Sequence, residues 1–250
     1  MSHIHIDIEN LSFSYEQGTP VLTNLSLHVS EHEAVGIIGA NGVGKSTLLK
    51  LLVGLDLNFT GEIRVEEIPL EKKTLPKIRE KIGYVFQDSD SQLFMTTVGE
   101  DVAFAPRNYG LPEEEVEKRV QDALEKVHIP HLRDKSIFRL SGGEKKLASL
   151  ATILSLTPDM IVLDEPSVAL DPKNRRNLIR ILNEFEHLKL IASHDLDFIW
   201  DTCSRVVLMN DGRIIADGTP EKILRDEKLL TENGLELPLS LTNRPPHPEP

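Results

Sequence analysis

The feature that most constrains the fold is the octapeptide at residues 39–46, which reads Gly-Ala-Asn-Gly-Val-Gly-Lys-Ser and directly follows an apolar run over residues 34–38. The pattern G-x-x-x-x-G-K-[ST] between a strand and a helix is typical of a phosphate-binding loop. Glycines let backbone N–H groups approach the phosphates, and the helix that begins near Lys45 adds the positive end of its dipole. We expect Lys45 to reach the β- and γ-phosphates and the Ser46 hydroxyl to bind Mg²⁺. A glycine-rich turn with an exposed lysine is the alternative interpretation.

Two adjacent carboxylates, Asp164 and Glu165, end a second apolar run that begins at residue 160. Open α/β sheets present their functional side chains at this carboxyl edge. Successive strand residues point to opposite sides, so the two acids can have separate roles. We expect Asp164 to support a Mg²⁺ ion and Glu165 to polarise an attacking water as a general base. The alternative is a plain strand end before a turn at Pro166.

A third element lies between these two, at residues 140–144, which read Leu-Ser-Gly-Gly-Glu. Residues 145–156 follow it with helical apolar spacing and contain neither Gly nor Pro. A Ser-Gly-Gly helix start can bind an anion, although an ordinary helix N-cap explains the same residues.

In their order along the chain, residues 39–47, 140–144 and 160–165 resemble the Walker A, signature and Walker B elements of an ABC-type ATPase. The resemblance extends over residues 4–225. It implies that the chain binds ATP with Mg²⁺, and that two such domains pair head to tail so that the signature of each completes the ATP site of the other. The implied ATP-binding residues are Tyr15, Gly39, Asn41, Gly42, Gly44, Lys45, Ser46 and Thr47, and the signature residues acting in trans are Ser141, Gly142, Gly143 and Glu144.

The resemblance gives a role to four further positions. Tyr15 matches an aromatic residue that stacks on adenine, and Gln87 matches a glutamine that touches Mg²⁺ and the attacking water. Asp171 ends the D-loop through which two such domains communicate, and His194 matches a switch histidine that contacts the γ-phosphate. Taken singly, each of the four reads as an ordinary strand, capping or surface residue. The implied metal ligands are Ser46, Gln87 and Asp164, and the implied catalytic residues are Glu165, His194 and Gln87.

Three positions depart from the usual pattern of the family. Leu147 stands where an arginine is frequent, Glu144 where glutamine is more common, and Ala169 where the D-loop often has glycine. We infer no loss of activity from these departures, because the phosphate-facing donors of the signature are present. The replacement of glycine at Ala169 is expected to restrict the D-loop slightly.

The segment that follows Gln87, to about residue 104, resembles cobalt/nickel importers and energy-coupling-factor vitamin importers in particular. In those proteins this region forms a groove for a helix of the membrane subunit. Phe94 and Phe104 are therefore candidate groove residues, and burial in the core is the alternative for each. The resemblance implies a membrane transport subunit, a substrate-binding membrane component and a homodimer or a heterodimer with a paralogue. Cobalt or nickel is the first expectation for the cargo and a vitamin the second.

Two function classes compete with transport. One is a soluble ABC ATPase that assembles complexes, as in iron–sulfur cluster biogenesis, and the groove-like segment after Gln87 argues against it. The other is a nucleotide-binding regulator without turnover, which the presence of both Glu165 and His194 disfavours.

The predicted fold is α/β: a P-loop NTPase of the ABC type with a mixed central sheet, an antiparallel β subdomain and an inserted helical subdomain over about residues 89–157. Residues 1–235 are expected to form the nucleotide-binding domain, and the proline-rich residues 236–250 a loosely ordered C-terminal tail. Antiparallel strands are predicted at residues 4–8, 21–29 and 62–66, and parallel strands at 34–38, 81–85, 160–163 and 188–192.

Composition excludes several classes of function. A net charge of −12 argues against nonspecific nucleic-acid binding, which needs a basic surface. No apolar run approaches the length of a membrane span, and the first residues lack the features of a secretory signal. A single cysteine, Cys203, precludes an intrachain disulfide framework. We therefore expect a peripheral protein at the cytoplasmic face of the cell membrane. The histidine pairs His3/His5 and His128/His131 lack the companions that a metal site needs.

Overall fold

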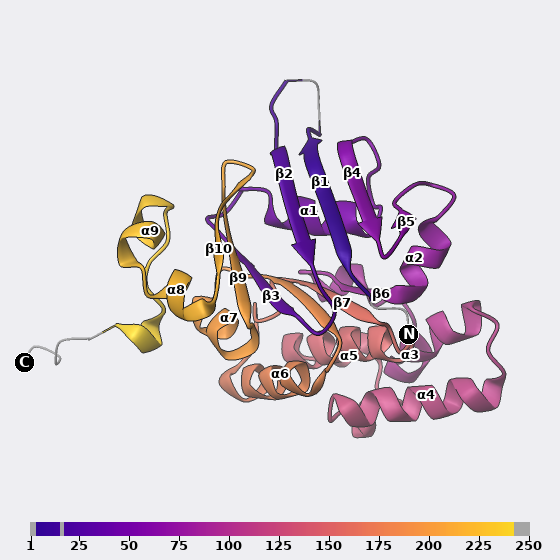
Figure 1. Cartoon of the computed structure of the whole chain (residues 1–250). Helices are drawn as coiled ribbons and strands as arrows, with labels where there is room; N and C mark the ends of the chain where they lie inside the picture. Colours follow the sequence, from indigo (N-terminus) through magenta and orange to yellow (C-terminus); the bar gives the residue numbers. More distant parts are fainter. Residues whose placement is uncertain (1–3, 16–17, 243–250) are drawn as a thin grey trace, which may run out of the picture.

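The computed structural model describes residues 4–15 and 18–242. Two β-sheets lie on either side of helix α1 (Lys45–Leu52), and a group of helices covers the opposite face of the larger sheet (Figure 1). One apolar core, which includes Ile6, Ile37 and Leu48, joins the two sheets through α1. A second core, which includes Leu124 and Leu150, fills the space between the larger sheet and the group of helices on its opposite face. The loop between the larger sheet and α1 is therefore anchored in packed structure at both ends.

The smaller sheet is antiparallel, with strand order β2-β1-β4-β5. Buried and exposed residues alternate along most of β2, because one face of this sheet packs on the core and the other faces solvent. The prediction of an antiparallel layer is confirmed, although its first strand extends well beyond residue 8. The strands are β1 (Ile6–Phe13), β2 (Leu22–Val29), β4 (Thr60–Val65) and β5 (Ile68–Pro69).

The larger sheet is mixed, with strand order β10-β9-β3-β8-β7-β6. All pairs are parallel except β9 with β10, which are antiparallel neighbours. Every residue of β3, β7 and β8 is buried, as their largely apolar sequences predict, and Asp164 and Lys189 are buried charged residues among them. The strands are β3 (Ala34–Ile38), β6 (Ile82–Val85), β7 (Met160–Asp164), β8 (Leu188–Ala192), β9 (Arg205–Asn210) and β10 (Arg213–Gly218).

The predicted helical subdomain is present, and three 3₁₀ turns divide it. Capping residues fix several helix starts: Thr97 and Glu100 form a capping box at α3, and Asp195 caps α7. In the part of the chain that the structure describes, no helix combines the length and apolar character needed to cross a bilayer. The remaining helices are α2 (Leu75–Lys81), α3 (Val98–Asn108), α4 (Glu113–Lys126), α5 (Gly142–Leu154), α6 (Pro172–Glu184), α7 (Leu196–Thr202), α8 (Pro220–Leu224) and α9 (Glu227–Glu232), with 3₁₀ turns η1 (Ser89–Ser91), η2 (Pro130–Leu132), η3 (Ile137–Arg139) and η4 (Leu239–Leu241).

The C-terminal segment differs from the prediction of a loose tail after residue 235. Leu235 and Leu237 pack against the core beneath the helices. The backbone N–H groups of Leu239 and Ser240 donate hydrogen bonds to the Asp197 carboxylate, at 2.9 and 3.0 Å. The structure thus extends the domain through residue 242, because apolar side chains and a backbone-binding carboxylate hold a segment that lacks periodicity. Residues 243–250, which contain the prolines that suggested the tail, lie outside the described residues.

Candidate functional site

The glycine-rich loop connects β3 to α1 in a conformation that only glycine adopts readily. Gly39, Gly42 and Gly44 have φ values of 151°, 85° and 106°. A Cβ on Gly39 would lie 2.4 Å from the Met209 carbonyl oxygen, so no larger residue fits there. Gly44 is the N-cap of α1, and no side chain caps the helix. The first N–H groups of α1 are consequently available to an anion.

Lys45 lies across the same loop. Its Nζ donates to the carbonyl oxygens of Gly39 and Ala40, at 2.7 and 3.1 Å, and the residue is 6% exposed. Burial lowers the pKa of Lys45, and the charges of Glu165 and Asp164 oppose that shift. The ammonium group is thus held within the glycine-rich loop.

Asp164 lies at the end of β7, with its carboxylate almost fully buried. Oδ1 accepts a hydrogen bond from Ser46 Oγ at 2.8 Å, and Oδ2 accepts one from Tyr84 Oη at 3.3 Å. Burial raises the pKa of Asp164, while the Ser46 bond opposes the shift. Gln87 lines the same cleft as Ser46. A hydroxyl, a carboxylate and an amide oxygen are hard ligands that suit Mg²⁺, and a cation would also favour the charged form of the buried acid. The residues present therefore fit this ion.

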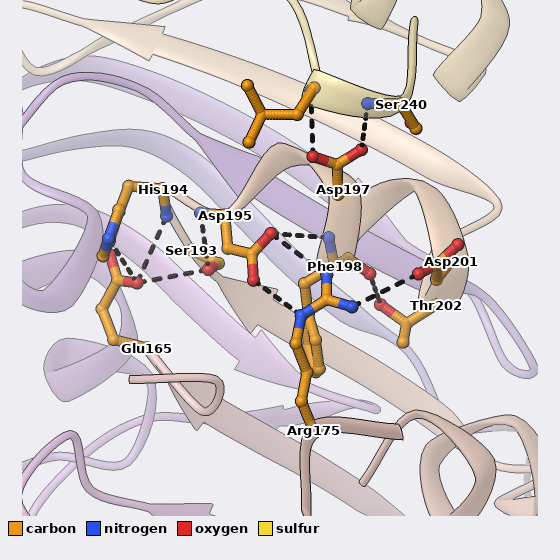
Figure 2. A network of polar contacts seen from close by, with 11 residues as sticks. Glu165, Arg175, Ser193, His194, Asp195, Asp197, Phe198, Asp201, Thr202 and Ser240 are labelled. Atoms are coloured by element: carbon orange, nitrogen blue, oxygen red, sulfur yellow. Dashed lines mark hydrogen bonds and ion pairs between the residues drawn. The ribbon is translucent and has the colours of Figure 1, made fainter. Parts of the chain in front are cut away.

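Glu165 and His194 meet at the carboxyl edge of the larger sheet (Figure 2). Glu165 Oε2 lies 2.8 Å from His194 Nδ1, and it accepts hydrogen bonds from His194 N and Ser193 Oγ, both at 3.2 Å. Glu165 is 6% exposed and has a φ of 46°, in the left-handed region that non-glycine residues rarely adopt. Such strain persists only where the surrounding contacts hold it. Three contacts to one oxygen thus fix the orientation of the carboxylate.

One cleft of about 550 Å³ brings together residues that are far apart in the sequence. It is large enough for the polar part of a nucleotide and opens to solvent. The residues singled out from the sequence that line it are Tyr15, Asn41, Gly42, Gly44, Lys45, Ser46, Thr47, Gln87, Glu165 and His194.

Tyr15 stands at the mouth of this cleft and is 60% exposed. Its hydroxyl lies 3.0 Å from Thr47 Oγ1, and Phe13 packs edge-on against its ring at a centroid distance of 4.9 Å. These two contacts orient the ring while the residue stays largely exposed. An exposed aromatic ring is a surface on which a nucleotide base can stack.

We expect Tyr15→Ala to raise the Kd for ATP about tenfold, because stacking of a base on an aromatic ring is worth about 1–3 kcal/mol. Fluorescence titration with ATP measures this change. Tyr15→Phe is the matched control: it keeps the ring and removes only the contact with Thr47, so its Kd should stay close to the parental value. An unchanged Kd in Tyr15→Ala would show that the base lies elsewhere.

The signature residues lie away from the cleft in the same chain. Ser141 and Glu144 form a capping box at α5: Ser141 Oγ accepts from Glu144 N at 3.3 Å, and Glu144 Oε2 accepts from Ser141 N at 2.7 Å. Ser141 and Gly142 are exposed, whereas Gly143 is buried. None of these residues lines the described cleft beside Lys45. The N-terminus of α5 therefore lies outside the described cleft of its own chain.

The predicted D-loop, residues 167–171, follows Glu165 and leads into α6. Asp171 caps that helix, since its Oδ1 accepts from the N–H groups of Lys173 and Asn174 at 2.8 and 2.9 Å. Ala169 has a φ of 63°, a left-handed conformation in which glycine carries no strain. A Cβ on Gly143 would lie 2.5 Å from Asn174 Nδ2, so the start of α6 comes close to the start of the signature helix.

Several contributors were not found by sequence reasoning. Tyr84 and Ser193 bind the two acids, but each occurs in or next to an apolar strand with no distinguishing pattern. Lys146 is buried, and its Nζ donates to the carbonyl oxygens of Phe86 and Gln87 at 3.0 and 2.8 Å. Burial lowers the pKa of Lys146 to about 8. The signal in the sequence that could have identified Lys146 is the position of a lysine on the apolar face of the predicted helix over residues 145–156.

The chain matches a protein-family model described as "ABC transporter" over residues 22–168. It is 45% identical over 238 residues to the energy-coupling factor transporter ATP-binding protein EcfA of Methanothermobacter thermautotrophicus, covering 93% of this chain and 76% of that protein. Among solved structures, cbiO1 of Clostridium perfringens, described as part of the ABC transporter complex cbiONQ, aligns with a TM-score of 0.81 and 36% identity over 91% of this chain and 93% of that chain. The ATP-binding cassette MJ0796, a dimer bound to ADP and phosphate after hydrolysis, aligns with a TM-score of 0.78 and 27% identity over 86% of this chain and 98% of that chain.

Proposed function

Because the chain belongs to the ABC transporter ATP-binding family and has that family's ATPase fold, we propose that it is the subunit whose ATP hydrolysis powers a membrane importer. The observation that carries this proposal is the single cleft that gathers the glycine-rich loop, Lys45, Glu165 and His194. Phosphoryl transfer to water needs phosphates held in place, charge compensation and an oriented nucleophile. The residues of the cleft can supply all three.

The roles in hydrolysis follow from the contacts. The loop N–H groups and Lys45 would hold the phosphates, with Tyr15 against the base. When bound, Mg²⁺ would be held by Ser46, Asp164 and Gln87 and would neutralise phosphate charge. Glu165 would orient a water and accept its proton, since His194 and Ser193 fix the carboxylate.

A complete site requires a second chain. The signature N–H groups lie outside the cleft of their own chain, and Ser141 and Gly142 are exposed for contact with a partner. We infer head-to-tail pairing, in which the signature of one chain closes over the ATP of the other and hydrolysis reopens the pair. The dimeric MJ0796 cassette supports this inference. The second chain can be a copy of this one or a paralogue.

An exposed aromatic pair marks the surface that would meet the membrane subunit. Phe94 and Phe104 are 62% and 39% exposed, and their rings contact edge to face at 4.7 Å. The core interpretation of these residues is therefore wrong. The carboxylate of the buried Asp101 accepts hydrogen bonds from the N–H groups of Phe94 and Met95, at 3.3 and 3.2 Å, and so holds the segment in shape. A fixed, exposed aromatic pair suits an apolar helix of a partner.

Import is supported by the names of the related proteins, one from an energy-coupling factor transporter and one from the cbiONQ complex. We propose cobalt or nickel as the first candidate cargo and a vitamin as the second. The chain would then act as a peripheral protein at the cytoplasmic face of the membrane, with a transport subunit and a substrate-binding membrane component. Assembly of soluble complexes is the second candidate function, and the exposed aromatic pair favours import over it.

The test is a mild-detergent pull-down of the tagged chain from its native cells with ATP present. A polytopic membrane protein among the partners is the expected result, and bound metal or vitamin in the same complex would identify the cargo. Exclusively soluble partners, with the chain absent from membranes, would favour the assembly ATPase.

The double variant Phe94→Ala/Phe104→Ala should lower the yield of the copurifying membrane subunit at least about tenfold, because central aromatic anchors are often worth 2 kcal/mol or more each. Quantitative mass spectrometry of the pull-down measures this yield. Ile215→Ala is the matched control, since Ile215 is an exposed apolar residue on β10, outside the segment. Equal yields from the two variants would remove the aromatic pair from the interface.

A further inference from the structure

Arg175 connects the D-loop helix to the loop that carries His194. It lies in the first turn of α6, where its N–H donates to the Asp171 carbonyl oxygen at 2.9 Å. Its guanidinium forms two parallel bonds to Asp195: Nε to Oδ2 at 3.0 Å and Nη2 to Oδ1 at 3.2 Å (Figure 2). The guanidinium carbon also lies 5.6 Å from the centre of the Phe198 ring. Two-point binding of this kind fixes the orientation of both groups.

Asp195 receives hydrogen bonds from two elements. The guanidinium of Arg175 donates from α6, and Phe198 N donates to Oδ1 at 2.9 Å, which caps α7. Burial alone would raise the pKa of Asp195, and the hydrogen bonds from Arg175 and Phe198 outweigh that effect and lower it. Arg175 follows the end of the D-loop, so the helix that continues this segment is tied to one carboxylate.

The chain of contacts continues from Asp195 to the catalytic candidates. Asp195 N donates to Ser193 Oγ at 3.1 Å, and that hydroxyl donates to Glu165 Oε2 at 3.2 Å. His194, between Ser193 and Asp195, contacts the same carboxylate oxygen. A shift of the Asp195 backbone would therefore displace both groups that orient Glu165.

We propose that Arg175 and Asp195 are positioning residues that couple the D-loop to the orientation of Glu165 and His194. This inference rests on the proposed roles of those two residues in hydrolysis. A Cβ on Gly142 would lie 3.8 Å from the Ala169 carbonyl oxygen, so the D-loop borders an exposed signature residue that would meet the partner chain. The pair would thereby make the water-orienting carboxylate sensitive to the partner chain. Displacement of a catalytic group by about 1 Å can cost as much as a hundredfold in rate, which gives such a connection leverage over turnover.

The first test compares kcat and KM for ATP in the full chain carrying Arg175→Lys or Asp201→Asn. Lysine keeps the positive charge and loses the parallel pair of bonds. Asp201→Asn is the matched control: Asp201 Oδ2 is a second acidic partner of Arg175, at 3.6 Å, and it lies in α7 rather than in the loop of His194. We expect Arg175→Lys to lower kcat about tenfold with KM within about threefold, and Asp201→Asn to keep both.

A purely structural role predicts a different pattern. Both substitutions weaken an ion pair of the same arginine, so both would lower the melting temperature without separating in kcat. Parental kcat in Arg175→Lys, or an equal loss in Asp201→Asn, would overturn the proposal.

The second test is a double-mutant cycle of Arg175→Gln, Asp195→Asn and the two combined. If the two residues act as one connection, kcat of the double variant should equal kcat of the more impaired single variant. If instead the fold loss of kcat in the double variant equals the product of the two single losses, the residues act independently and the proposal is overturned. Glu165→Gln, assayed alongside, distinguishes a failure of the proposed function from a failure of the coupling. A parental kcat in Glu165→Gln would contradict the proposed function. A reduced kcat in Glu165→Gln together with a parental kcat in Arg175→Lys would contradict only the coupling.

Discussion

Glu165→Gln is expected to lower kcat for ATP hydrolysis by about a hundredfold or more and to leave the ATP-bound dimer closed. The amide keeps the shape of the side chain but cannot accept the proton of the attacking water, a contribution worth about 10²–10⁴-fold. ATP binding should persist, because the phosphate loop is unchanged. Phosphate release measures the rate, and size-exclusion chromatography with ATP measures the dimer.

Glu184→Gln makes the same chemical change at an exposed site near the end of α6 and should behave like the parent. Turnover at the parental rate in Glu165→Gln would remove the general-base role. A slow variant that stays monomeric with ATP would retain that role and contradict the closed-dimer intermediate.

Lys45→Ala should nearly abolish turnover by weakening ATP binding. Hydrogen bonds to charged groups are worth about 1.5–3 kcal/mol, so loss of the ammonium group should raise the Kd for ATP about 10- to 100-fold. Lys45→Arg should not rescue binding, because Nζ lies only 2.7 Å from the Gly39 carbonyl oxygen in a buried position that the larger guanidinium does not fit. Equilibrium titration with ATP measures both effects.

Lys77→Ala removes an exposed lysine from α2 and serves as the matched control, with an expected parental Kd. Parental binding in Lys45→Ala would mean that the N–H groups of the loop and the start of α1 suffice for the phosphates.

The sequence predicts best those parts of the fold that depend on local pattern. Strands β3 and β8 have the predicted bounds, because a parallel sheet buried on both faces requires continuous apolar runs. The antiparallel layer and the helical insertion were also predicted correctly in kind. The pair β9 and β10 was missed: β10 is an edge strand in which exposed and half-buried residues alternate, a weak signal. The C-terminal boundary was missed because it depends on Asp197, far away in the sequence.

The residues of the candidate site likewise fall into those that a local sequence pattern identifies and those that only the structure reveals. Motifs identified Lys45, Asp164 and Glu165, and the structure places these residues around a single cleft or at its edge. The residues that orient them, such as Ser193 and Arg175, are visible only in three dimensions, since their partners come from other elements. Their residue types are common, and no spacing in the sequence indicates that they meet an acid. The assigned roles remain predictions that the variants above test.

The capping box at α5 suggests a rule for comparing related sequences. A glutamine at position 144 could complete the same box, so folding of the helix does not demand the acid found here. The carboxylate of Glu144 carries a charge that would face a partner's phosphates, and Lys135 neutralises it through a contact of 2.8 Å. Positions 135 and 144 should therefore vary together in evolution. A glutamate at position 144 would be accompanied by a basic residue at position 135, whereas a glutamine at position 144 would allow an uncharged residue at position 135.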